Sequence, residues 1–96
     1  MNKAEIIVRL VGQRDALQAL GVSALRLFGS AARDSAVETS DADFIVRFSA
    51  PPTFDRYMDL KLHLERVLGM RVDLVTETAM RPELREAIER DAVHVA

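Results

Sequence analysis

Apolar side chains recur along this chain at two different spacings, and each spacing predicts one kind of element. In two stretches they return every three or four residues, which is typical of an amphipathic helix: residues 3–20 and 54–68. Asn2 and Thr53 can cap the first turns of these helices. Gly21 and Gly69 follow the last apolar positions and can end them. A last helix is expected to begin at Arg81-Pro82, because proline favours the first helical position.

Elsewhere apolar and polar residues alternate, as they do in a strand that is buried on one face. The stretches concerned are residues 22–28, 42–48 and 71–75, with a possible short edge strand at 93–95. In the second stretch a shift of one residue would bury acids and expose phenylalanines, so its register is fixed. Strands that alternate with helices predict an α/β fold. We expect a small mixed sheet with helices packed mainly on one face.

Length and composition narrow the class of protein. The 96 residues suffice for a single domain, residues 1–96, with one core. No residue is a cysteine, which rules out thiolate metal sites and suits a cytoplasmic location. The net charge is −2 and no basic run is present, so a nucleic-acid-binding surface has little support. No stretch approaches the roughly 20 apolar residues of a membrane span. We therefore expect a cytoplasmic protein without direct membrane or nucleic-acid binding.

Acidic residues interrupt two of the apolar strand candidates. Asp41 and Asp43 are two residues apart and project to the same face, roughly 6.6–6.8 Å apart at the backbone. Carboxylates this close resist joint ionisation unless a cation lies between them, and Mg²⁺ prefers oxygen ligands. Asp73 joins the pair if its strand lies beside residues 42–48. Solvated acids at a strand start, with Asp73 on an edge strand facing water, are the alternative.

Gly29-Ser30 lies where the strand over residues 22–28 ends and a helical turn begins. Such a junction presents free backbone N–H groups that can bind a phosphate, and the Ser30 hydroxyl can add a hydrogen bond. Glycine and serine are also common in turns of no functional consequence. The junction alone therefore leaves both interpretations open.

The spacing of these two features is more informative than either one. Gly29-Ser30, ten intervening residues and then Asp41-Ala42-Asp43 resemble the signature of the nucleotidyltransferase superfamily. The chain as a whole is similar to minimal members of that superfamily, the MNT antitoxins encoded beside HEPN toxins. Further similar segments are Arg33, residues 40–46, residues 72–75 and the closing helix. The chain departs from the family at Ala31, where a basic or bulky residue is common, and at Asp34, where glycine is common.

The resemblance implies a polymerase-beta-like nucleotidyltransferase fold and a role for each of these residues. Asp41, Asp43 and Asp73 would bind two Mg²⁺ ions and act as the catalytic residues, and Asp73 would also help to deprotonate the attacking hydroxyl. The residues expected to bind the nucleotide are Gly29, Ser30, Arg33 and Ser40.

The resemblance also implies a function and a partner. The expected activity is that of an antitoxin which transfers AMP from ATP to a tyrosine of its cognate HEPN ribonuclease toxin. One alternative is an antitoxin that neutralises the toxin by binding alone. Another is a nucleotidyltransferase that acts on a small molecule or a nucleic acid, which we expect less because of the small size and the expected lack of an acceptor-binding domain.

Overall fold

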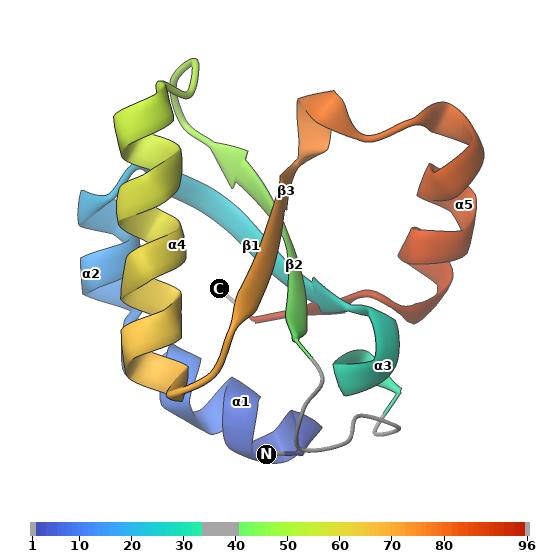
Figure 1. Ribbon diagram of the computed structural model, residues 1–96, viewed down its shortest axis with the longest axis horizontal. Helices are drawn as coiled ribbons and strands as arrows, with labels where there is room; N and C mark the ends of the chain where they lie inside the picture. The colour runs from blue at the N-terminus through green and yellow to red at the C-terminus, as the bar shows by residue number, and fades with distance from the viewer. Residues whose placement is uncertain (1, 34–40, 96) are drawn as a thin grey trace.

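Four strands form one mixed sheet in the computed structural model, which describes residues 2–33 and 41–95 of the chain. Their order across the sheet is β3 (Val72–Thr76), β2 (Ala42–Phe48), β1 (Val22–Phe28) and β4 (Val93–His94). β2 is parallel to β3, whereas β1 is antiparallel to both β2 and β4. The predicted small mixed sheet is confirmed, and β3 forms one of its edges (Figure 1).

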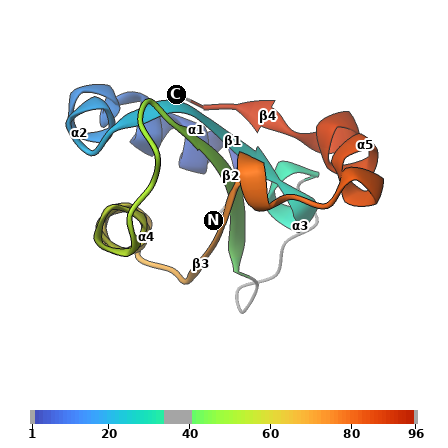
Figure 2. The ribbon, with the colours of Figure 1, turned by 90° about the horizontal axis from the view of Figure 1, so that it is seen from above.

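The helices are divided unequally between the two sides of this sheet. In chain order they are α1 (Lys3–Val11), α2 (Arg14–Ala19), α3 (Gly29–Ala32), α4 (Phe54–Leu68), the 3₁₀ helix η1 (Glu77–Ala79) and α5 (Pro82–Asp91). α4 and α5 lie on opposite sides of the sheet in both views (Figure 1 and Figure 2). The main core involves α1, α2 and α4, so the expectation of helices mainly on one face is confirmed. Among the helices of the described residues, none is long and apolar enough to cross a membrane.

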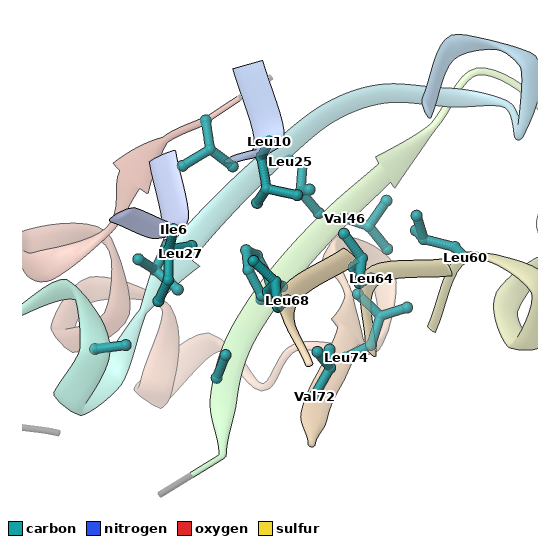
Figure 3. Packing of buried hydrophobic residues seen from close by; sticks show 14 of the residues in the cluster. Ile6, Leu10, Leu25, Leu27, Val46, Leu60, Leu64, Leu68, Val72 and Leu74 are labelled. Atoms are coloured by element: carbon teal, nitrogen blue, oxygen red, sulfur yellow. The ribbon is translucent and has the colours of Figure 1, made fainter. Parts of the chain in front are cut away.

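The main core lies between the sheet and the helices α1, α2 and α4. Figure 3 shows how side chains from one face of the strands meet those of α1 and α4. The strands contribute Leu25, Leu27, Phe44, Val46, Val72 and Leu74, and the helices contribute Ile6, Leu10, Leu17, Leu60, Leu64 and Leu68. All are nearly inaccessible to solvent. Because alternate strand residues enter this core, Asp43 and Asp73 are directed to the opposite face.

The first helical segment is broken, which the sequence pattern did not predict. The helix expected over residues 3–20 is two helices, with Gly12 at the end of α1 and Gln13 before α2. Gln13 N–H donates to the Leu10 carbonyl at 2.9 Å, three residues back, which tightens the chain before α2 begins. Glycine loses more conformational entropy in a helix than any other residue, so Gly12 favours the break.

The other element ends agree closely with the sequence. Asn2 Oδ1 accepts from Glu5 N–H at 2.9 Å, and Thr53 Oγ1 accepts from Arg56 N–H at 3.1 Å, so both predicted caps are confirmed. Gly69 ends α4 with a φ of 66°. β3 begins and ends one residue later than expected, and η1 was not predicted.

The face of the sheet that carries the acids is partly covered. Ile45 alternates with Asp43 and points away from the main core, yet it is only 1% exposed. Met80 is also buried outside the main cluster. α5 contacts β1 and lies on the opposite side of the sheet from α4, so it covers part of this face beside β1 (Figure 1 and Figure 2). Asp43 and Asp73 occupy the end of the face where β2 and β3 begin.

Candidate active site

Asp43 and Asp73 are direct neighbours across the parallel pair β2 and β3. The register places Ala42 opposite Val72, Asp43 opposite Asp73 and Phe44 opposite Leu74. Asp43 is half-buried, whereas Asp73 and the preceding Asp41 are exposed. The buried residues on either side of each acid fix this register, because a shift by one residue would bring the acids into the core.

The glycine-serine turn lies against Asp43. β1 pairs with β2 so that Phe28 is opposite Asp43, and Gly29 follows directly. Gly29 has a φ of 72°, which side chains with a Cβ rarely adopt. A Cβ at this position would overlap Oδ2 of Asp43 and lie 3.3 Å from its Cγ. Glycine is therefore required both by the backbone and by the closeness of the carboxylate.

The electrostatic environment makes Asp43 a weak acid. Its pKa is raised to about 6, first by partial burial and then by the negative charges of Asp73 and Asp41. A side-chain hydrogen bond to Asp73 raises the pKa further, and the positive charge of Arg33 opposes these effects. The ionised form of Asp43 thus lacks sufficient positive charge nearby, which is the environment that a bound cation would relieve.

The acids fit a metal ion that brings other ligands with it. In the ranges 2–33 and 41–95, no group of three or more histidine, aspartate or glutamate side chains is gathered closely enough to hold a metal unaided. Asp43 and Asp73 are paired, and Asp41 is near enough to affect the pKa of Asp43. Mg²⁺ typically takes one or two carboxylates and completes its shell with water and substrate phosphates. The donor set therefore suits Mg²⁺ bound together with a nucleotide.

The structure describes some of the other residues predicted to bind a nucleotide more fully than others. Arg33 is exposed at the end of α3, close enough for its charge to lower the pKa of Asp43. Ser30 lies within α3, directly after Gly29. Its side chain, like Ser40 and Asp34, lies outside the described residues. Ala31 is buried in the core, which leaves it no direct access to a phosphate.

Two residues that the sequence motifs do not include make specific contacts. The Tyr57 hydroxyl donates a hydrogen bond to the Leu74 carbonyl at 2.6 Å. His63 Nε2 lies 3.1 Å from Gln13 Oε1 and joins α4 to the residue that precedes α2. A contact to a main-chain carbonyl depends on the fold, and no residue pattern along the chain indicates it.

Comparisons with known proteins identify the family to which the chain belongs. The model of a family described as the nucleotidyltransferase domain matches residues 10–95. Protein adenylyltransferase MntA of Thermococcus cleftensis is 32% identical over 83 residues, which span 86% of this chain and 84% of that protein.

Solved structures share the fold. One, described as a candidate minimal nucleotidyltransferase, superposes with a TM-score of 0.84 at 38% identity and covers 97% of this chain and 95% of its own. A second is an MNT antitoxin in complex with the tri-AMPylated HEPN toxin of Shewanella oneidensis. It has a TM-score of 0.68 at 18% identity, over 93% of this chain and 70% of that chain. At that identity the second likeness concerns the fold alone.

Proposed function

Because the chain belongs to the nucleotidyltransferase domain family, we propose that it is a Mg²⁺-dependent protein adenylyltransferase. In this proposal it acts as an antitoxin and transfers AMP from ATP to a tyrosine of a HEPN ribonuclease toxin. One observation carries the proposal: Gly29 lies against Asp43, which is in register with Asp73. A turn suited to phosphates and a pair of acids suited to a cation thus meet at one point.

The relatives support the choice of a protein as the acceptor. MntA of Thermococcus cleftensis is named a protein adenylyltransferase, and the chain matches most of its length. In the Shewanella oneidensis complex, a protein with this fold is bound to a HEPN toxin that carries AMP groups. A similar pairing would give this chain its substrate.

Each residue of the site has a proposed role. Asp41, Asp43 and Asp73 would hold two Mg²⁺ ions, whose charge would neutralise the phosphates and favour the ionised form of the attacking hydroxyl. Gly29 permits the close approach of phosphates to the backbone of the turn, where Ser30 donates a hydrogen bond. Arg33 and Ser40 add contacts to the nucleotide. Because these residues bind the other phosphates and the rest of the nucleotide, the α-phosphorus is left open to in-line attack.

The transfer itself requires one proton acceptor. The tyrosine oxygen forms a bond to the α-phosphorus, and the bond from that phosphorus to the oxygen of the β-phosphate breaks. Pyrophosphate leaves with the electron pair of the broken bond. The tyrosine proton passes to the Asp73 carboxylate, which is exposed at the edge of the sheet and accessible to an incoming side chain.

The experiment measures the transfer of AMP to a HEPN partner that has not been exposed to the active chain. The partner is incubated with the purified chain, MgCl₂ and ATP labelled at the α-phosphate, and its intact mass is recorded. We expect a labelled partner whose mass increases by whole AMP units. Asp43→Ala should reduce transfer by at least about 100-fold, because even residues behind metal ligands cost 10- to 100-fold when they are replaced. Glu77→Gln, an acid on the neighbouring η1, is the matched control and should retain the parent rate.

The same variants separate the alternatives. If Asp43→Ala still neutralises the toxin in cells and the partner never gains mass, the chain is a binding antitoxin. If the α-label appears in a small molecule or a nucleic acid and not in the partner, the acceptor has been assigned wrongly. Either result would refute a protein adenylyltransferase.

A further inference from the structure

Among the strands of the described residues, β3 lies at one end of the sheet, and its outer edge includes the residues immediately before and after Asp73. The order of the sheet leaves β3 with β2 as its neighbour on one side. Ala42 N–H donates to the Arg71 carbonyl at 3.0 Å, so the main-chain groups of Arg71 point toward β2. Because these groups alternate along a strand, those of Val72 and Leu74 point to the outer edge.

α4 binds one outward main-chain group of each of these two residues through its side chains. Glu65 Oε2 accepts a hydrogen bond from Val72 N–H at 3.1 Å. The Tyr57 hydroxyl donates to the Leu74 carbonyl at 2.6 Å. Both side chains are half-buried on α4, where contact with β3 and exclusion of water strengthen a hydrogen bond. One donor and one acceptor of the strand edge are therefore bound, immediately before and immediately after Asp73.

Apolar packing excludes a shift of β3 by one residue, which would bring Asp73 into the core, but it does not fix the exact position of the strand along its axis. The side chains of Val72 and Leu74 are 3% exposed and hold β3 against the core, but apolar contact is non-directional. Parallel pairing is also slightly weaker per residue than antiparallel pairing, and β3 has 5 residues. Hydrogen bonds from a rigid helix supply the direction that the packing lacks.

We infer that Tyr57 and Glu65 are positioning residues that hold Asp73 in register with Asp43 for metal binding. The inference rests on the proposed function, since it concerns the same acids. Neither residue reaches the reacting atoms. They act through the main chain of β3, as groups behind a metal ligand orient the ligand itself.

The test compares the affinity for Mn²⁺ among variants that remain folded. Mn²⁺ is titrated in the presence of an ATP analogue that cannot be cleaved between the α- and β-phosphates. Tyr57→Phe removes the hydroxyl and keeps the ring, and Glu65→Ala removes the acceptor. Both should weaken Mn²⁺ binding by about tenfold. Glu65→Gln keeps an acceptor oxygen and should remain close to the parent, as should Glu77→Gln, which lies outside this contact.

Hydrogen exchange in the same samples reports whether the edge has been released. Faster exchange of the Val72 amide in Glu65→Ala, together with weaker Mn²⁺ binding, supports the inference. The inference would be overturned if the Val72 amide exchanged faster while the affinity for Mn²⁺ stayed the same. It would also be overturned if Glu65→Gln bound Mn²⁺ as weakly as Glu65→Ala. If the unaltered chain binds no Mn²⁺, it is the proposed metal centre that fails. If instead the unaltered chain and the variants bind Mn²⁺ equally well, only the positioning role of Tyr57 and Glu65 fails.

Discussion

Two positions on one face of β2 differ in the charge that faces them. Asp43 lies opposite Asp73 of the neighbouring strand, so two acids meet. Four residues further along the strand, Arg47 meets Glu77 of η1 in a two-fold contact, with Nε 3.0 Å from Oε2 and Nη2 2.9 Å from Oε1. The first pair carries like charges and the second carries opposite charges.

The two pairs shift pKa values in opposite directions. The pKa of Asp43 is raised to about 6, mainly by burial and by Asp73. The pKa of Glu77 is lowered, mainly by its hydrogen bond to Arg47. At neutral pH the ionised form of Asp43 therefore opposes folding, whereas the ionised form of Glu77 does not. An unfavourable pair held in register by the core is best explained by a ligand that compensates it, whereas the second pair needs no ligand.

The largest expected effect comes from filling the space between the turn and the acid. In Gly29→Ala the new Cβ would overlap Asp43 Oδ2, and a φ of 72° adds strain of about 1–2 kcal/mol. We expect transfer to fall by at least about 100-fold, because the turn or the acid must move. The measurement is the rate of AMP transfer, with the thermal midpoint recorded in parallel.

Gly69→Ala is the matched control for that substitution. Gly69 has a similar φ of 66°, but a Cβ there would have nothing within 4 Å. It should therefore cost comparable stability, about 1–2 kcal/mol, and leave transfer unchanged. Equal losses of transfer in both variants would mean that strain, and not the closeness of Gly29 to Asp43, explains the effect.

The next effect is a gain in stability that accompanies the loss of function. Asp43→Asn removes the like charge opposite Asp73, so the metal-free variant should be more stable than the parent at pH 7. The raised pKa corresponds to roughly 3 kcal/mol before screening, and the partial exposure of the carboxyl reduces this to about 1 kcal/mol. For a chain of this size the thermal midpoint should rise by roughly 4–8 °C.

Adding Mg²⁺ and ATP should reverse that order. The ligands should stabilise the parent, since they bind its folded form, and should have little effect on Asp43→Asn. A variant that is less stable than the parent without metal would contradict the unfavourable character of the acid pair.

The sequence predicted the parts of this comparison that depend on local pattern. The alternation in residues 42–48 gave the bounds of β2 and the outward direction of Asp43, because one buried face fixes a register. The spacing from Gly29 to Asp43 indicated a shared site through its resemblance to a family. The position of Asp73 opposite Asp43 required the pairing of two strands separated by α4, which a periodic pattern does not determine.

The parts that the sequence missed depend on contacts between distant segments. The pair of Arg47 and Glu77 joins a strand to a 3₁₀ helix that was not predicted. Gly12 was overlooked because the apolar spacing continues across it, from Leu10 to Leu17, although the helix does not. Burial of Ile45 on the acidic face could not be predicted either, since it depends on how the elements outside the main core are arranged.

A smaller effect concerns how the acid pair responds to pH. The pKa of Asp43 is higher in the folded chain, about 6, than its ordinary value of 3.8, so the folded state binds the proton more tightly. The stabilising contribution of the protonated form is complete below about pH 3.8 and is lost as the pH rises to about 6. The advantage of Asp43→Asn over the metal-free parent should therefore be absent near pH 3.8 and reach its maximum above about pH 6.

Thermal midpoints of the two proteins at a series of pH values measure this difference. The effects of titratable groups that both proteins share, such as Glu77, cancel when one thermal midpoint is subtracted from the other. An advantage that is constant over the whole range would mean that Asp43 titrates normally.

The smallest effect is expected at the opposite-charge pair. Arg47 keeps 61% of its side chain exposed and Glu77 keeps 23%, so water and salt screen their attraction. Glu77→Gln should lower the thermal midpoint by about 2 °C or less, and the loss should shrink further in high salt. Arg47→Gln should have the same effect, and the double variant should lose no more than either single one, because both remove one interaction. Transfer by all three variants should equal that of the parent. A large loss of transfer would mean that the two pairs are coupled along β2, and the contrast between a ligand site and a purely structural contact would no longer hold.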